Sequence, residues 1–308
     1  MMDRIPHLIP YQGSKRKLAE RILDEINFPI DTFYEPFAGS AAITLAAIAD
    51  RAANKYVISD KLEALAGIWQ MVAKSPTLLA DQYETFWNEQ TGQEKDYFNK
   101  IRDRFNKEKG PAELLFLIAR CVKNSIRFNS AGEFNQGPDN RRRGMSPKKV
   151  RQEALRIHHL LKGKATIMAA SFQDVLVNAT SKDFVYMDPP WQGTSNNRDP
   201  RYAFVLNLDE LVAEMERLNA ANVPFVLSFD GECGNRSYGK ELPSKLDLTR
   251  VALKAGRSSQ ATLLGRSEIT IESLYLSPAV IERRAKITSR KVKAAQPKLF
   301  ASEMSFEG

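Results

Sequence analysis

The sequence of 308 residues predicts an α/β fold: one sheet of short buried strands with helices between them, and a mainly helical subdomain inserted into it. Short apolar runs that stop at a proline, a glycine or an acidic residue indicate the strands, and an alanine-rich segment over 41–49 indicates a helix between the first two. From 63 to 163 the pattern is helical. This stretch is too long for a crossover between neighbouring strands, so it predicts an insertion.

Ahead of the first strand, residues 9–17 form a basic loop with Tyr11, Gly13 and Lys15, followed by a helical pattern. A glycine close to a lysine can admit a ligand that carries a carboxylate. A solvated basic turn before a helix explains this segment equally well.

A strand, a turn of small residues and a helix follow over 32–49. The apolar run breaks at Pro36, and Gly39 lies where backbone N–H groups at the start of the helix can face a ligand. The next strand, 55–59, ends in Asp60, twenty-one residues after Gly39, which is the spacing at which an acid binds ribose hydroxyls. Since no GxGxxG fingerprint is present, the pattern favours a ligand with a ribose but no diphosphate.

The insertion contains a polar loop with aromatic and basic side chains over 123–151. Arginine and lysine contact phosphates, and asparagine and arginine contact bases, so the loop is a candidate surface for reading a nucleic acid. A solvated charged loop is the alternative, although it explains Phe128 and Phe134 less well. The candidate nucleic-acid-binding residues are Asn124, Arg127, Asn129, Asn135, Arg141, Arg142 and Arg143.

Strand character returns over 165–171, and Asp174 follows it. This acid can accept a hydrogen bond from an adenine amino group, or it can be a helix N-cap. Later segments predict a helix over 206–218, a buried strand over 224–229, a mobile loop over 230–240 and edge strands over 248–253 and 268–276. From 279 to 308 the chain reads as a basic, disordered tail.

The strand over 184–187 ends at Asp188, because Pro189 and Pro190 can continue neither a strand ladder nor a helix. Trp191 adds a large aromatic face. Open α/β sheets bind ligands at the carboxyl ends of their strands. A carboxylate and a free carbonyl can accept two N–H bonds from a flat ring that stacks on the indole, although Asp-Pro also begins ordinary turns.

Composition narrows the class of protein. The net charge of +8 favours a polyanionic partner. The two cysteines, Cys121 and Cys233, form no metal-binding spacing, so no metal site is expected. No apolar run approaches the ~20 residues that span a bilayer, and the first residues lack a signal-peptide core, so we expect a cytoplasmic protein.

Several of these motifs occur together in the order of a known family. Tyr11 to Lys15, Glu35 to Gly39, Asp60, Asn129 to Asn135, Phe172 to Asp174 and Asp188 to Trp191 resemble the motifs of Dam-like, D12-class adenine-specific DNA methyltransferases. The resemblance covers residues 8–278. Where the family usually has tyrosine, this chain has Trp191, which keeps the stacking face but leaves RNA adenine open as a substrate.

The resemblance implies a Rossmann-like sheet in two segments, 1–62 and 164–278, that binds S-adenosyl-L-methionine, with 63–163 as the target-recognition insertion. It implies no metal. The cofactor residues would be Tyr11, Gly13, Lys15, Glu35, Phe37, Gly39, Asp60, Phe172 and Asp174, and the catalytic residues Asp188, Pro189, Pro190 and Trp191. The substrate would be a flipped-out adenine in double-stranded DNA, methylated at N6. A binding protein without turnover and a cytosine amino methyltransferase, which usually carries serine in place of Asp188, are the alternatives.

The tail holds one short motif. Gln296, Leu299 and Phe300 have a spacing that resembles bacterial sliding-clamp-binding peptides. Adjacent leucine and phenylalanine side chains can fill apolar pockets, so a clamp is a possible partner. A solvated basic tail is the alternative.

Overall fold

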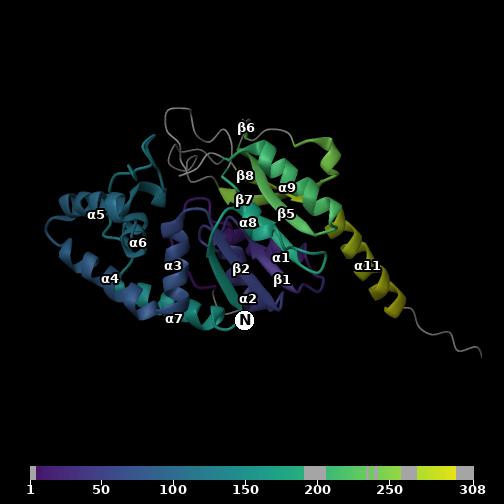
Figure 1. Cartoon of the computed structure of the whole chain (residues 1–308), viewed down its shortest axis with the longest axis horizontal. Coiled ribbons are helices and arrows are strands. Elements are labelled where there is room, and N and C mark those ends of the chain that lie inside the picture. Colours follow the sequence, from purple (N-terminus) through teal and green to yellow (C-terminus); the bar gives the residue numbers. More distant parts are fainter. Residues whose placement is uncertain (1–4, 191–205, 234–235, 239–241, 258–268, 296–308) are drawn as a thin grey trace, which may run out of the picture.

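The computed structural model describes residues 5–190, 206–233, 236–238, 242–257 and 269–295, and it has the predicted α/β architecture (Figure 1). The strands are β1 (Thr32–Glu35), β2 (Lys55–Asp60), β3 (Ala165–Ala169), β4 (Phe184–Met187), β5 (Phe225–Cys233), β6 (Arg236–Tyr238), β7 (Thr249–Arg257) and β8 (Ile269–Leu276). The helices are α1 (Ala19–Asp24), α2 (Ala42–Asp50), α3 (Glu63–Lys74), α4 (Pro76–Glu89), α5 (Glu94–Glu108), α6 (Pro111–Arg120), α7 (Pro147–Leu161), α8 (Phe172–Leu176), α9 (Leu208–Ala220) and α11 (Pro278–Ala295), with 3-10 turns η1 (Lys15–Leu18), η2 (Val122–Asn124) and η3 (Ser244–Leu246).

The sheet has the strand order β3-β2-β1-β4-β5-β8-β7, and β6 pairs with β5. Strands β3, β2, β1, β4 and β5 are parallel, whereas β8 runs antiparallel between β5 and β7. The carboxyl ends of the five parallel strands therefore share one edge of the sheet. Ligands of open α/β sheets bind at this edge.

Alternate residues of β4 face opposite sides of the sheet, and each side has its own core. Phe184 and Tyr186 pack with α1, α2 and the helical subdomain, while Val185 and Met187 pack with α8 and α9. All four side chains are buried, which is the pattern of a parallel strand covered on both faces. The buried strand expected from the sequence is confirmed here.

Five helices, α3 to α7, lie between β2 and β3, as the insertion predicts. Helices α4, α5 and α6 lie to one side of the sheet in Figure 1. The apolar run on α6 is its core, because Leu114 to Ile118 are at most 1% exposed. Helices α3 and α7 pack together and join this subdomain to the sheet, α3 against β2 and β3 and α7 against α2.

Two segments differ from the expectation. The mobile loop expected over 230–240 is partly strand, since β5 continues through Cys233 in register with β8 and pairs with β6. The segment 278–295, expected as disordered tail, is helix α11. Its first turns are anchored because Val280 is fully buried and Ile287 packs against the core.

Candidate active site

Four predicted site positions follow four adjacent parallel strands. Asp174 lies beyond β3, Asp60 ends β2, Gly39 lies beyond β1 and Asp188 follows β4. The strand order β3-β2-β1-β4 places them in that sequence along one edge. Neighbouring strands lie ~4.8 Å apart, so the row is about 14 Å long. Ligands bound along this edge can therefore contact these four positions.

Asp60 supports the turn after β1. Its carboxylate accepts hydrogen bonds from the backbone N–H of Gly39 at 3.0 Å and from that of Leu62 at 2.9 Å. Burial raises the pKa of Asp60 to about 6, and the two hydrogen bonds act against this rise. Each carboxylate oxygen can still accept a second hydrogen bond, for instance from a ribose hydroxyl.

Gly39 has a φ of +49°, which favours glycine. A Cβ placed there would stand 3.4 Å from the Tyr11 ring, so that ring covers the turn. The side chain of Trp69 donates from Nε1 to the Gly39 carbonyl at 3.0 Å. The turn therefore has a fixed backbone and a slot beside an aromatic ring.

Glu35, predicted within this turn, is 3% exposed and binds helix α2. Its Oε2 accepts hydrogen bonds from the backbone N–H of Thr44, at 2.8 Å, and from the Thr44 hydroxyl. The N-cap residue of α2, Ala41, has no side chain able to accept such a bond. Burial raises the pKa of Glu35 to about 8, against the bonds from Thr44. Glu35 thus holds the helix start in place beneath the turn.

The loop before α1 meets this turn and the insertion. The Ser14 and Ser40 hydroxyls lie 2.8 Å apart, and the backbone N–H of Gln12 donates to the Asn124 carbonyl at 3.1 Å. Gly13 has a φ of +88° and is exposed. The sequence left open whether this loop was a solvated turn, and the structure packs it against the site.

Lys15 joins this loop to the end of β4. Its Nζ lies 2.9 Å from Asp188 Oδ1 and 3.6 Å from Glu272 Oε2, and it donates to the Gly13 carbonyl at 3.1 Å. The side chains of Lys15, Asp188 and Glu272 are 6%, 20% and 15% exposed. Burial raises the pKa of Asp188, and the Lys15 ammonium opposes that rise. The Asp188 carboxylate, at the turn that follows β4 (the Asp188 corner), is the main chemical feature of the site.

Asp174 and Phe172 form the far end of the row. The Phe172 and Phe37 rings lie with centroids 5.2 Å apart. Asp174 is exposed and accepts a 2.7 Å hydrogen bond from the Ser171 hydroxyl. Ser171, not Asp174, is the N-cap of α8, because its Oγ accepts from the Asp174 backbone N–H. The N-cap alternative for Asp174 is therefore wrong, and the carboxylate faces solvent.

After Asp188, Pro189 is buried and Pro190 is half-buried. Trp191 lies outside the described residues.

The candidate DNA-reading loop is held by its own side chains. Asn124 donates from Nδ2 to the Ile118 carbonyl at 2.8 Å. Asn129 accepts the backbone N–H groups of Ala131 and Glu133 at 3.0 and 2.9 Å. These two amides shape the loop, whereas Asn135 is exposed and Arg127 is half-buried.

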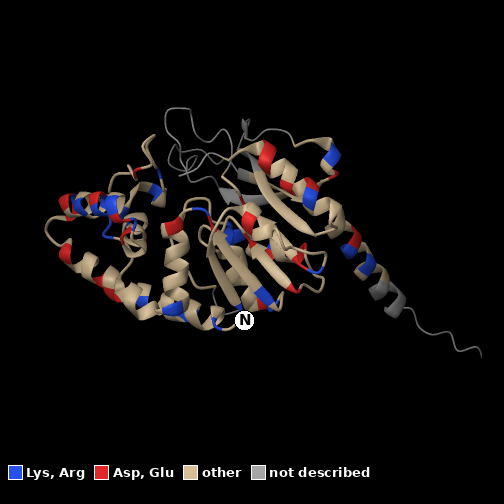
Figure 2. Cartoon of the chain, in the orientation of Figure 1, with Lys and Arg blue, Asp and Glu red and all other residues tan. Residues whose placement is uncertain are grey.

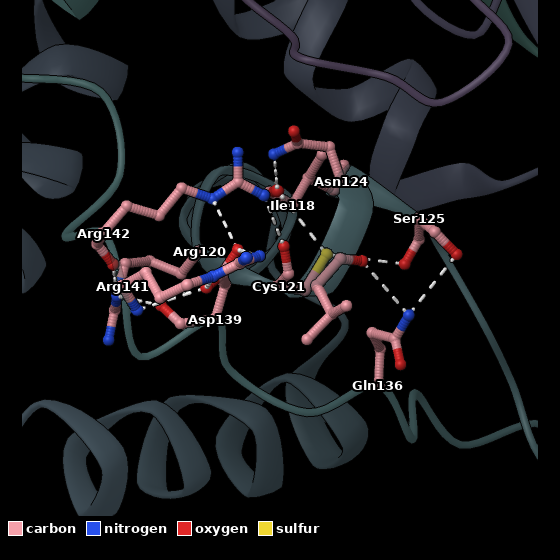
Figure 3. A network of polar contacts seen from close by, with 10 residues as sticks. Ile118, Arg120, Cys121, Asn124, Ser125, Gln136, Asp139, Arg141 and Arg142 are labelled. Carbon is pink, nitrogen blue, oxygen red and sulfur yellow. Dashed lines mark hydrogen bonds and ion pairs between the residues drawn. The ribbon is translucent and has the colours of Figure 1, made fainter. Parts of the chain in front are cut away.

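The three arginines after the loop are also paired within the protein, and Figure 3 shows two of them, Arg141 and Arg142. Arg141 and Arg142 form ion pairs with Asp139 at 2.9 and 3.2 Å, and Arg142 also donates to the Cys121 carbonyl at 3.0 Å. Arg143 lies over the Trp87 ring. Only Arg141 is mainly exposed, with 82% of its side chain accessible. Figure 2 shows basic and acidic residues side by side along α5, so charge on this helix is mixed.

Two charged residues of these surfaces, Arg120 and Glu272, were not predicted from the sequence. Arg120 is 1% exposed and donates to the carbonyls of Asp139, Arg142 and Glu94, which fixes the arginine segment. Glu272 approaches the site from β8. Glu272 is the one charged residue of β8, and this was the signal that could have identified it.

Within the described ranges, no group of three metal-binding side chains is present. In the same part of the chain, no helix is long and apolar enough to cross a membrane.

The family model of the D12 class N6 adenine-specific DNA methyltransferases matches residues 11–212. Among similar curated proteins, the Type II methyltransferase M.MjaIII of Methanocaldococcus jannaschii is 27% identical over 60% of this chain and 68% of its own length. The Modification methylase StsI of Streptococcus sanguinis is 28% identical over 71% of this chain but only 34% of its own length. The Retron Ec67 DNA adenine methylase of Escherichia coli is 28% identical over 52% of this chain and 55% of its own length.

Proposed function

The chain belongs to the D12 class of N6 adenine-specific DNA methyltransferases, and on this premise we propose that its Asp188 corner directs methyl transfer to the N6 amino group of an adenine in DNA. Membership of this family implies DNA as the substrate and a methyl donor of the S-adenosylmethionine type. The observation that carries the proposal is the row of Asp174, Asp60, Gly39 and Asp188 along the carboxyl edge of the sheet.

The residues present fit S-adenosylmethionine. Asp174 and the Phe37–Phe172 pair suit an adenine ring, and Asp60 retains acceptor capacity for ribose hydroxyls. Gly13, Lys15 and the Tyr11-covered turn at Gly39 suit the methionine end. When bound, the cofactor supplies an electrophilic methyl group on a sulfonium.

The target adenine must leave the duplex to reach this corner. Flipping costs a few kcal/mol in lost stacking and pairing. We assign Trp191 to stack on the flipped base, which returns about 1–3 kcal/mol. The half-buried Pro190 belongs to the turn beside which the flipped adenine ring would lie.

Asp188 and the Pro189 carbonyl act on the amino group. Its lone pair is delocalised into the ring, so it is a weak nucleophile. If the Asp188 carboxylate and the Pro189 carbonyl accept hydrogen bonds from its two N–H groups, the nitrogen becomes pyramidal. Its lone pair then points out of the plane of the ring. The same acceptors would stabilise the positive charge that grows on nitrogen as it takes up the methyl group, and the Asp188 carboxylate could accept the proton that this nitrogen then loses.

Two relatives carry the words "Type II methyltransferase" and "Modification methylase" in their names. We extend this role to the present chain as site-specific modification of double-stranded DNA in a restriction-modification setting. The loop over 123–151 is the proposed target-reading surface, and Asn135 and Arg141 are among its exposed candidates.

The test uses the purified chain with S-adenosylmethionine labelled in its methyl group. DNA and RNA of mixed sequence are offered separately, and the products are digested to nucleosides and separated. The proposal requires label in N6-methyldeoxyadenosine. Label only in the RNA adenosine or in deoxycytidine would contradict it, and cofactor binding without methyl transfer to any nucleic acid would indicate a binding protein.

A further inference from the structure

Glu272 approaches the site from a part of the chain that the family model does not cover. That model matches residues 11–212, and Glu272 lies on β8 between β5 and β7. Strand register shifts by one residue on both sides of it, between Ser228 and Gly231 in β5 and between Lys254 and Gly256 in β7. Such irregularities re-aim side chains and often lie beside active sites.

The strand neighbours of Glu272 on its face of the sheet are mainly apolar. Leu274 and Leu276, on the same face of β8, are fully buried, and Leu253, directly opposite on β7, is 2% exposed. A carboxylate in such surroundings loses hydration and is costly unless it is paired. Burial raises the pKa of Glu272, with the nearby Lys15 acting against the rise. Glu272 therefore needs a partner for its charge at this position.

The partner of Glu272 is the ammonium group that also holds Asp188. Lys15 Nζ lies 2.9 Å from Asp188 and 3.6 Å from Glu272, so two carboxylates share one cation. A tight Lys15–Asp188 pair weakens the ability of Asp188 to accept hydrogen bonds from another group. The target amino group needs those same carboxylate oxygens.

We infer that Glu272 is a positioning residue for methyl transfer, which holds the Lys15 ammonium while the target amino group occupies Asp188. This inference rests on the proposed function. Without the charge of Glu272, Lys15 has one carboxylate partner fewer and stays on Asp188. The amino group then meets a neutralised acceptor, and the transfer step slows although the cofactor site is intact.

The first test is the Glu272→Gln variant, which keeps size and shape and removes the charge. Its kcat falls about tenfold or more, while the Kd for S-adenosylmethionine stays within about threefold. Glu272→Asp keeps the charge and regains at least part of the lost kcat. The matched control is Glu153→Gln, because Glu153 is 2% exposed and paired with Lys149 on α7, outside this site. This control can lose thermal stability but keeps its kcat.

The second test asks whether Glu272 acts through Lys15. In single-turnover experiments, Glu272→Gln lowers the rate constant of methyl transfer in the wild type but changes it little in a Lys15→Gln variant. The same double-mutant cycle can be measured on the melting temperature of the cofactor-free chain, which needs no substrate. There, too, the decrease in the double variant is smaller than the sum of the decreases in the two single variants. Additive effects in both cycles overturn the inference.

The outcomes separate the two proposals. A wild type that methylates DNA beside an equally active Glu272→Gln variant overturns the role of Glu272 alone. A wild type that binds the cofactor and methylates no nucleic acid overturns the proposed function and, with it, this role. If Glu272→Gln does not fold, a Glu272→Asp variant with the kcat of Glu272→Ala overturns the inference, because charge then has no effect.

Discussion

The proposed chemistry depends on Asp188, and its surroundings have opposite effects on the pKa of its carboxyl group. Burial favours its neutral form, while the Lys15 ammonium favours the carboxylate. Acceptance of two amino hydrogens needs the carboxylate. Lys15 therefore keeps the group in the required form, and its hold has to loosen when the target arrives.

Trp191 gives the most specific prediction about a single side chain. Trp191→Ala loses the stacking face, so kcat/KM for DNA falls about tenfold or more. Trp191→Tyr keeps an aromatic face and retains much of the activity. Steady-state methyl transfer with both variants measures this. Equal activities of the alanine and tyrosine variants would show that the aromatic face has no role.

At the scale of elements, the carboxylate that caps α2 makes stability depend on pH. The pKa of Glu35 rises from 4.5 to about 8 on folding, so between these values the folded chain binds a proton that the unfolded chain has lost. The free energy of unfolding contributed by this group falls as pH rises through that window. Glu35→Gln removes the contribution, and its melting temperature declines less steeply from pH 5 to 8 than that of the wild type.

The control for this measurement is Glu153→Gln. Glu153 is as buried as Glu35, but its pKa is lowered: burial opposes this shift, and the bonds from Lys149 and the His7 N–H outweigh it. In Glu153→Gln, the melting temperature declines from pH 5 to 8 as steeply as in the wild type. Parallel melting curves for the wild type and Glu35→Gln would contradict the assignment.

The arginine segment gives a prediction about DNA affinity. Arg142 and Arg143 have structural partners, so neutralising all three arginines lowers stability as well as binding. Arg141 also pairs with Asp139, but it is the most exposed of the three, so Arg141→Gln alone changes a side chain that is open to DNA. Its binding to DNA weakens for all sequences, and the slope of log K against log salt decreases by about one. Lys245→Gln, an exposed lysine paired with Glu216, leaves the slope unchanged, and an unchanged slope for Arg141→Gln would mark a solvated loop.

The elements show how far the sequence predicts the structure. Strand β4 was predictable to the residue, because four apolar side chains stop at Asp188 before two prolines. Helix α11 was not, since basic composition obscured the two anchors, Val280 and Ile287. Local patterns also could not reveal that Glu272 reaches Lys15 across 257 residues of sequence, because strand order creates that contact.

For the whole molecule, the proposed clamp peptide gives a separate prediction. Gln296, Leu299 and Phe300 lie outside the described residues, just after α11, which extends from the side of the sheet away from α4 and α5 (Figure 1). We expect the host sliding clamp to bind the intact chain and not the Leu299→Ala, Phe300→Ala variant. Binding raises the local enzyme concentration on DNA. A titration in which both chains bind equally, or neither binds, ends this proposal.

The central claim is that the Asp188 corner methylates adenine at N6 in DNA. The most direct measurement sequences native DNA, with detection of modified bases, from a host without adenine methylation that expresses this chain. The wild type is predicted to give N6-methyladenine at one short recurring sequence, and Asp188→Ala to give none while binding S-adenosylmethionine within a few-fold of wild type. Adenine methylation by Asp188→Ala at the wild-type level, or modification of cytosine alone, would contradict the account.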